Sequence, residues 1–179
     1  MLIKINSGNK NKLAEYRAYL EDYDCQVEAT QEALEEPVSD HETVICYKAS
    51  QFSDGTLVDD VSLEIEGFDV GVHVRWFLEN DAFRQEKYWG RPSVFTCYIG
   101  VHKDGYVYLY EGSVEGTIVS PRGNCFGIAP FFLPKGKSKT LGEDMPAELN
   151  PRYLALQKFL NEDWSLKRKL IKQWDGEFQ

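Results

Sequence analysis

The sequence predicts a mixed α/β domain over residues 1–179, with a mixed β-sheet flanked by helices. Two patterns predict this class: strand and helix signals alternate through the first third of the chain, and antiparallel strand signals followed by helices fill the rest. The composition supports it, because 42% hydrophobic and 27% charged residues are typical of a globular protein. A chain of this length can bury a substantial core without disulfides or structural metals.

The N-terminal elements follow from short periodic patterns. Residues 2–6 alternate apolar and polar side chains, and Ser7-Gly8-Asn9 interrupts the alternation. Asp40 is placed as the N-cap of a helix, because it precedes an apolar pattern at helical spacing. We expect, in order, a strand at 2–6, a helix at 11–20, a strand at 25–29 and a helix at 43–52.

The rest of the chain reads as strands, one long loop and terminal helices. The Asp104-Gly105 pair lies between two alternating segments and is a hairpin signal. We expect a turn at Ser53-Asp54-Gly55, a strand from Thr56 that ends at Asp59-Asp60, a short helix at 72–79, strands at 94–101, 106–110 and 113–119, a loop at 120–139, and helices at 151–160 and 164–174.

Charge and cysteine usage exclude several classes of function. Twenty Lys and Arg against 29 Asp and Glu give a formal charge of −9, which disfavours general nucleic-acid binding. No apolar run is long enough to cross a membrane, and no signal peptide is recognisable, so we expect a cytoplasmic protein without a membrane partner. The four cysteines are too scattered for a zinc site and are expected to be free thiols.

The first candidate for a functional site is the strand–loop–helix at residues 2–20. The Ser7-Gly8-Asn9 turn leaves main-chain N–H groups where a helix begins, and Lys10 and Lys12 lie in its first turn. Such a helix start suits an anion, phosphate above all. Basic residues there also oppose the helix dipole. The local pattern alone favours an ordinary capped helix with solvated lysines.

The second candidate is the acidic pair Asp59-Asp60. A carboxylate at the end of a strand can hold Mg²⁺ or orient a water, because Mg²⁺ prefers oxygen ligands. The Glu35-Glu36 pair beside Pro37 can supply a partner carboxylate. The alternative is a solvated acidic turn, and two acids do not decide between them.

The third candidate is the loop from Ser120 to Phe132. Its Phe126-Gly127 step lies between prolines, so an aromatic ring could be held there to stack on a base. A core plug under a long loop is an equally good interpretation.

Taken together, these segments resemble the inosine triphosphate pyrophosphatases, which hydrolyse non-canonical purine nucleoside triphosphates. The resemblance runs from Leu2 to about Leu160. Its strongest motifs are Ser7-Gly8-Asn9-Lys10-Asn11-Lys12, Leu57-Val58-Asp59-Asp60, Lys48-Ala49, Trp76-Phe77 and Gly116-x-Ile118-x-x-Pro121-Arg122-Gly123. Their order and spacing are more specific than any one of them.

The resemblance implies a fold, a reaction and a set of site residues. The reaction splits the bond between the α and β phosphates and gives a monophosphate and pyrophosphate, with Mg²⁺ as cofactor. A homodimer is also implied. The implied substrate-binding residues are Ser7, Asn9, Lys12, Lys48 and Arg75 for the triphosphate, Phe126 for the base, and Arg152. Glu36 and Asp60 would hold the metal, Asp60 would be the base for the attacking water, and Asp59 would support it.

The departures from the family pattern concern the base rather than the phosphates. The family motif F-G-[YW]-D-P is here Phe126-Gly127-Ile128-Ala129-Pro130, and Ser-His-Arg is Asn150-Pro151-Arg152. The Asp and the His are therefore missing. Polar groups that pair with a base edge discriminate strongly, so we expect an altered or relaxed base preference.

Two other functions stay open. A degenerate family member could bind a nucleotide without turnover, although the acidic residues and Lys12 argue for a working site. An interaction protein is suggested by the basic tail at 164–174, which is better explained as a solvated helix face.

Overall fold

The computed structural model describes residues 1–53 and 55–179. The chain divides into two compact units. The first comprises Met1–Asp60, Tyr98–Glu111 and Ala155–Gln179, and the second comprises Val61–Cys97 and Gly112–Leu154. The prediction that residues 1–179 act as a single domain stays a prediction.

The described residues form one mixed sheet of eight strands, which confirms the predicted α/β class. The strand order is β2-β1-β3-β5-β6-β7, with β4 paired to β3 and β8 paired to β6. The strands are β1 (Leu2–Asn6), β2 (Gln26–Thr30), β3 (Thr56–Ile65), β4 (Phe68–Gly71), β5 (Pro92–Lys103), β6 (Tyr106–Ile118), β7 (Phe132–Pro134) and β8 (Leu166–Lys169). The helices are α1 (Lys10–Tyr19), α2 (His41–Ser50), α3 (Val74–Glu79) and α4 (Pro151–Leu160).

In the first unit, β1 lies between two parallel neighbours. Ile5 of β1 is opposite Ala29 of β2 and Leu57 of β3. Parallel strands need crossover connections, and here α1 connects β1 to β2 while α2 precedes β3. The carboxyl ends of β1 and β2 therefore lie at the same edge of the sheet, where the loop before α1 begins.

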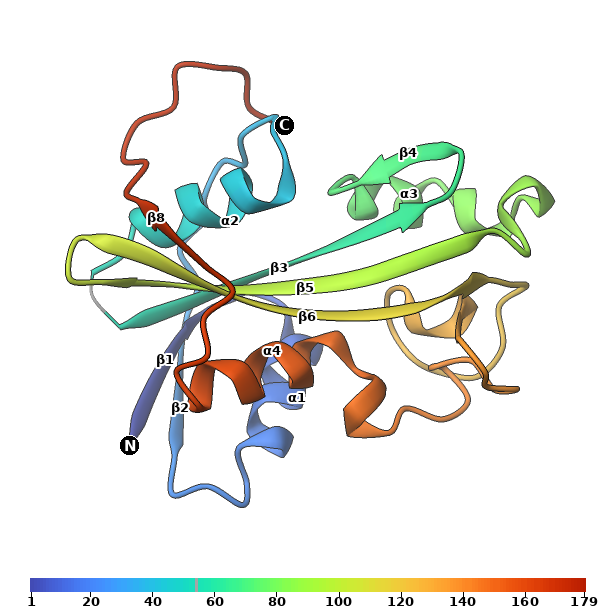
Figure 1. The fold of residues 1–179 in the computed structure, drawn as a ribbon, viewed down its shortest axis with the longest axis horizontal. Helices are drawn as coiled ribbons and strands as arrows, with labels where there is room; N and C mark the ends of the chain where they lie inside the picture. Colours follow the sequence, from blue (N-terminus) through green and yellow to red (C-terminus); the bar gives the residue numbers. More distant parts are fainter. Residues whose placement is uncertain (54) are drawn as a thin grey trace. The chain divides into compact units, whose positions relative to one another are not determined.

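Helices cover both faces of the sheet in this unit (Figure 1). On one face, α1 and the last turns of α4 pack on the sheet; the buried residues there include Tyr16, Leu57, Ile99 and Leu156. On the other face, α2 packs on the sheet, with Ile45, Val58 and Leu109 among the buried residues. Leu57 and Val58 are adjacent in β3 and point to opposite faces, as the period of a strand requires.

Gly100 of β5 allows α2 to lie close to the sheet. A Cβ atom at this position would lie 3.1 Å from Ile45 Cγ1 and 3.3 Å from the Cβ of Ala49. Any larger residue would push these side chains away. The glycine thus sets the distance between α2 and the sheet, and with it the distance of Lys48 from the sheet.

The second unit has its own core around aromatic residues. β4 pairs antiparallel with β3, and β7 pairs antiparallel with β6. Phe77 of α3 is fully buried and contacts the rings of Tyr88 and Phe131.

The predicted helix at 164–174 is wrong. Residues Leu166–Lys169 form β8, which pairs antiparallel with residues 106–109 of β6. Leu166, Leu170 and Ile171 pack against the α2 face of the sheet. Apolar residues at helical spacing misled the prediction, because an unpaired strand edge offers main-chain partners that outweigh local helix preference.

Two predicted strand boundaries are also wrong. The segments predicted as separate strands at 106–110 and 113–119 form one strand, β6, which continues through Gly112 and ends at Ile118. β3 does not end at Asp59-Asp60 but runs to Ile65, because Val61, Leu63 and Ile65 continue its apolar alternation. The predicted turn at 53–55 includes Asp54, which lies outside the described residues. None of the helices in the described part of the chain has the length and apolar composition that a bilayer crossing requires.

Candidate active site

The candidate site lies where β3 extends past the end of β1. Asn6, the last residue of β1, is opposite Val58. Asp59 and Asp60 follow Val58 and therefore lie on the part of β3 beyond this neighbour. The carboxyl ends of parallel strands are the usual ligand-binding edge of an open α/β sheet. The offset between the two strands brings the acidic pair to that edge.

Asp59 pairs with Lys12 on the α1 face. Lys12 Nζ lies 3.0 Å from Asp59 Oδ1, and the exposed fractions of the two side chains are 17% and 2%. A carboxylate this deeply buried requires a partner of opposite charge. Lys12 supplies it from the first turn of α1.

The loop before α1 is stiffened by its own polar side chains. Ser7 Oγ accepts a hydrogen bond from the N–H of Asn9 at 3.2 Å. Asn9 is the N-cap of α1, and its Oδ1 accepts from the N–H groups of Asn11 and Lys12 at 2.9 and 3.2 Å. The ordinary capped helix is therefore present in the structure. The loop is held in one shape before any ligand arrives.

Lys48 joins two carboxylates on the α2 face. Its Nζ lies 2.9 Å from Glu36 Oε1 and 3.5 Å from Asp60 Oδ1. Burial lowers the pKa of Lys48, but attraction to Asp60 and Glu36 outweighs burial and leaves the pKa above its ordinary value. Lys48 is therefore an ammonium ion held between two carboxylates that are 24 residues apart in sequence.

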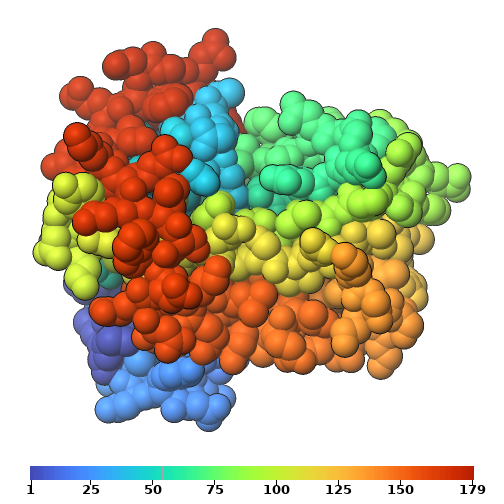
Figure 2. Space-filling model, viewed as in Figure 1, coloured from blue at the N-terminus to red at the C-terminus, as the bar shows by residue number. Residues whose placement is uncertain are grey.

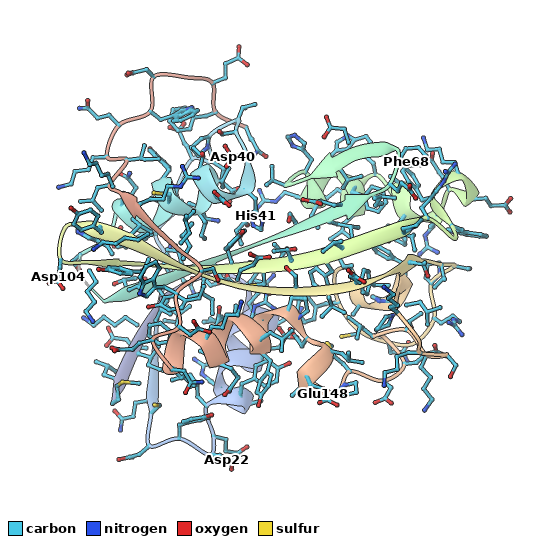
Figure 3. The ribbon with its side chains drawn as sticks, in the orientation of Figure 1. Asp22, Asp40, His41, Phe68, Asp104 and Glu148 are labelled. Carbon is cyan, nitrogen blue, oxygen red and sulfur yellow. The ribbon has the colours of Figure 1, made fainter. Side chains whose placement is uncertain are left out.

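His41 also contacts Asp60, and sequence reasoning missed it. His41 Nε2 lies 3.6 Å from Asp60 Oδ2, and the imidazole meets the Tyr98 ring edge-on at 4.9 Å between centroids. Figure 3 shows His41 at the start of α2, beside Asp40. Burial lowers the pKa of His41 more than the charge of Asp60 raises it, which favours the neutral imidazole. The signal for it was its spacing: His41 precedes Lys48 by seven residues, which is two helical turns on one face.

The predicted site residues of the first unit thus form two groups rather than one. Asp59 and Lys12 lie on the α1 face, whereas Glu36, Lys48 and Asp60 lie on the α2 face. The two groups meet at β3, where Asp59 and Asp60 are adjacent residues. The convergence of Lys12, Glu36 and Asp60 on one polyphosphate stays a prediction.

The other predicted residues belong to the second unit. Arg75 is exposed in the first turn of α3, and Phe126 is half-buried. Arg152 is buried, and its N–H donates to Asn150 Oδ1 at 2.9 Å at the start of α4. Ala129, which replaces the family's Asp, is buried in the core of this unit.

The residues present fit a hard divalent cation such as Mg²⁺. Glu36 and Asp60 direct carboxylate oxygens at the same ammonium group, so both can reach a cation near it. The described part of the chain holds no cluster of three or more His, Cys, Asp or Glu side chains arranged for a metal ion. Mg²⁺ needs no such cluster, because it commonly uses one or two protein carboxylates together with waters and substrate phosphates.

Comparisons with known proteins identify the family of the chain. The sequence model of the Ham1 family matches residues 3–162. A dITP/XTP pyrophosphatase of Pyrobaculum aerophilum is 30% identical over 96% of this chain and 100% of its own length. An inosine triphosphate pyrophosphatase of Schizosaccharomyces pombe is 30% identical over 85% of this chain and 89% of its own.

A solved structure shows the same fold. The HAM1 protein from Coxiella burnetii superposes with a TM-score of 0.72 at 24% identity, over 90% of this chain and 99% of that one. The family match and the relatives confirm the resemblance seen in the sequence. The chain belongs to the Ham1 family.

Proposed function

We propose that this chain hydrolyses a nucleoside triphosphate to the monophosphate and pyrophosphate with the help of Mg²⁺. Its family and the names of its relatives make it a nucleoside triphosphate pyrophosphatase. The observation that carries the reaction is the position of Lys48 between Glu36 and Asp60. This group combines a cation for phosphate oxygens with carboxylates for a metal and a water, which is the set that phosphoryl chemistry requires.

The roles follow from which atoms face which groups. Lys48 and Lys12 neutralise the triphosphate, and Glu36 and Asp60 hold the metal. Bound Mg²⁺ supplies a positive charge that polarises the phosphate and stabilises the charge that develops during bond cleavage. Asp60 Oδ1 faces Lys48, whereas Oδ2 faces His41. Asp60 can therefore bind the metal through one carboxylate oxygen and accept the proton of the attacking water with the other.

The phosphate-facing loop and the remaining residues complete the proposal. Ser7 and Asn9 present the start of α1 to the triphosphate, and Asp59 orients Lys12 through their ion pair. Arg75 and Arg152 are proposed to bind the substrate, and Phe126 to stack on the base. The cytoplasmic location and the homodimer stay predictions.

We propose further that the base preference differs from that of the relatives. Ala129 carries no polar group, and Pro151 begins α4 without a side-chain donor. A site that lacks the groups that pair with a 6-oxopurine loses the penalty that these groups impose on other bases. Relaxed or shifted preference is the expected consequence.

The test is pyrophosphate release across a panel of canonical and deaminated NTPs and dNTPs, with and without Mg²⁺. Asp60→Asn is expected to lose activity, whereas Asp104→Asn, the same change in an exposed hairpin turn, is expected to retain it. Binding of nucleotide without release of pyrophosphate by the wild type would contradict the enzyme and favour a binding protein. Strict preference for ITP and XTP would contradict only the altered base preference.

A further inference from the structure

The residues after β8 form a strap along α2. We define the C-terminal strap as residues 170–179. The N–H of Ile171 donates to Ser50 Oγ at 2.9 Å, and its carbonyl accepts from Gln51 Nε2 at 3.1 Å. Figure 2 shows this part of the chain (red) packed against the segment and helix at 31–50 (light blue). The strap is thereby fixed to the last turn of α2.

The tip of the strap pairs with the segment that carries Glu36. The N–H of Gln179 donates to the carbonyl of Glu36 at 2.8 Å, and the N–H of Val38 donates to the carbonyl of Glu177 at 2.9 Å. Pro37 lies opposite Phe178 in an antiparallel bridge. In such a bridge the central pair exchanges no hydrogen bonds, so the missing N–H of Pro37 costs nothing there.

The tip has its own anchors. The Phe178 ring contacts the Tyr47 ring of α2 at 5.9 Å between centroids. Trp174 Nε1 donates to the carbonyl of Glu177 at 3.0 Å and closes the bend of the strap. A Cβ atom at Gly176 would lie 2.8 Å from Trp174 Nε1, so the bend packs tightly on the indole. These contacts give the tip a defined position before it meets Glu36.

Glu36 is the site residue that depends most on such support. It lies in residues 31–36, which form neither helix nor strand. Its main-chain carbonyl is held by Gln179, and its side chain contacts Lys48, the neighbour of Asp60. A ligating carboxylate binds a metal well only when outer contacts hold it in place. The match to the Ham1 family model ends at residue 162, before the strap begins.

We infer that residues 177–179 position Glu36 for the metal, so that the affinity of this protein for Mg²⁺ depends on the strap. The inference rests on the proposed function, because that function assigns Glu36 to the metal. It concerns how the carboxylate is held and adds a second requirement to the site: residues far from the chemistry must be in place before the metal binds well.

The experiment compares a deletion of residues 177–179 with Gln179→Ala, which keeps every main-chain hydrogen bond of the tip. The deletion is expected to weaken Mg²⁺ binding about tenfold by calorimetry without nucleotide. The Mg²⁺ concentration for half-maximal turnover should rise by the same factor, and excess Mg²⁺ should restore the rate. Gln179→Ala should match the wild type in both measurements.

A single substitution locates the effect at one hydrogen bond. Gln179→Pro removes the N–H that holds the Glu36 carbonyl and should act in the same direction as the deletion. Amide exchange at Val38 reports release of the tip, and all binding is measured well below the melting temperature of each variant. A deleted protein with wild-type affinity for Mg²⁺ would overturn the inference. A wild type without turnover would overturn the proposed function alone, because the calorimetric comparison still decides the role of the strap.

Discussion

Asp59 and Asp60 are adjacent in β3, yet their carboxylates lie on opposite faces of the sheet. Asp59 contacts Lys12 beneath α1, and Asp60 contacts Lys48 beneath α2. The alternation of side chains in a strand makes this unavoidable. Under the proposed function the two acids therefore have different tasks: Asp59 orders Lys12, and Asp60 faces the metal and the attacking water.

Removing the charge of Asp59 should harm stability first. Asp59→Asn leaves the ammonium of Lys12 without its buried partner, which costs about 3 kcal/mol of the free energy of unfolding. Chemical denaturation of Asp59→Asn, Lys12→Met and the double variant measures this. The double variant should be more stable than the sum of the single losses predicts, because it leaves no unpaired charge. Additive losses of the free energy of unfolding would show that Asp59 and Lys12 do not stabilise each other.

Asp60 should affect turnover more than stability. Asp60→Asn keeps the shape of the side chain but removes the proton acceptor, so kcat should fall by about 10²-fold or more. Asp59→Asn, measured below its melting temperature, should raise KM more than it lowers kcat. Steady-state kinetics of the two variants separate these effects. Equal losses of kcat would contradict the division of labour between the two acids.

Lys48 and a metal ion should compete for the same carboxylates. Lys48→Met leaves Glu36 and Asp60 facing each other without a cation, so added Mg²⁺ should raise its melting temperature more than that of the wild type. Turnover should nevertheless fall, because the phosphate contact is lost. Lys48→Arg is the control that keeps the charge. Thermal melts with and without Mg²⁺ check the prediction, and an identical Mg²⁺ effect in all three proteins would contradict it.

Asp40 should stabilise α2 through its charge as well as its shape. Its Oδ1 accepts from the N–H of Thr43 at 2.9 Å. Burial raises the pKa of Asp40, but the hydrogen bonds from Thr43 and Ser39 outweigh it and leave the pKa below its ordinary value. Asp40→Ala should cost about 1 kcal/mol at pH 7.

The pH dependence of this cap has a definite sign. A carboxylate with a lowered pKa stabilises the fold above its unfolded pKa and loses that effect as the pH falls through the folded pKa. The difference in melting temperature between the wild type and Asp40→Ala should be constant from pH 8 to about 5 and shrink below about pH 4. Asp40→Asn, which retains a cap without this titration, is the reference. A difference that grows in acid would refute the assignment.

Cys46 should react with an alkylating reagent more slowly than Cys25 and Cys125. Its side chain is fully buried under the residues around Lys169, and burial raises the pKa of the thiol. Cys25 and Cys125 are half-buried. Alkylation at pH 8 followed by mass spectrometry should label Cys25 and Cys125 well before Cys46. Rapid labelling of Cys46 in the folded protein would show that the chain does not cover it.

The sequence predicted the parts of the fold that depend on local pattern. The N-cap at Asp40, the helix that carries Lys48 and the hairpin at Asp104-Gly105 are present because each is specified within a few residues. The tail was wrongly predicted as a helix from its local spacing of apolar residues. Its pairing with β6 is a contact between segments distant in sequence, which local pattern does not reveal. His41 was missed for the same reason: its role depends on Asp60, which lies in another element.

The site was predictable in its residue types and not in its arrangement. The candidate acids and lysines could be named from the sequence, because the motifs that contain them resemble those of a known family in order and spacing. Their division between the two faces depends on β3 continuing past Asp60. The sequence did not reveal this continuation, because two adjacent acidic residues are typical of the end of a strand.

The pairing of Pro37 with Phe178 also constrains the order in which the molecule folds. Gln179 Nε2 reaches the carbonyl of Pro37 across 142 residues of sequence. Contacts of such high sequence separation form slowly, because a long loop must close before they contribute. The Glu36 segment can therefore gain these contacts only after residues 177–179 have been synthesised. We therefore expect Glu36, the carboxylate proposed for the metal, to reach its final geometry late in folding.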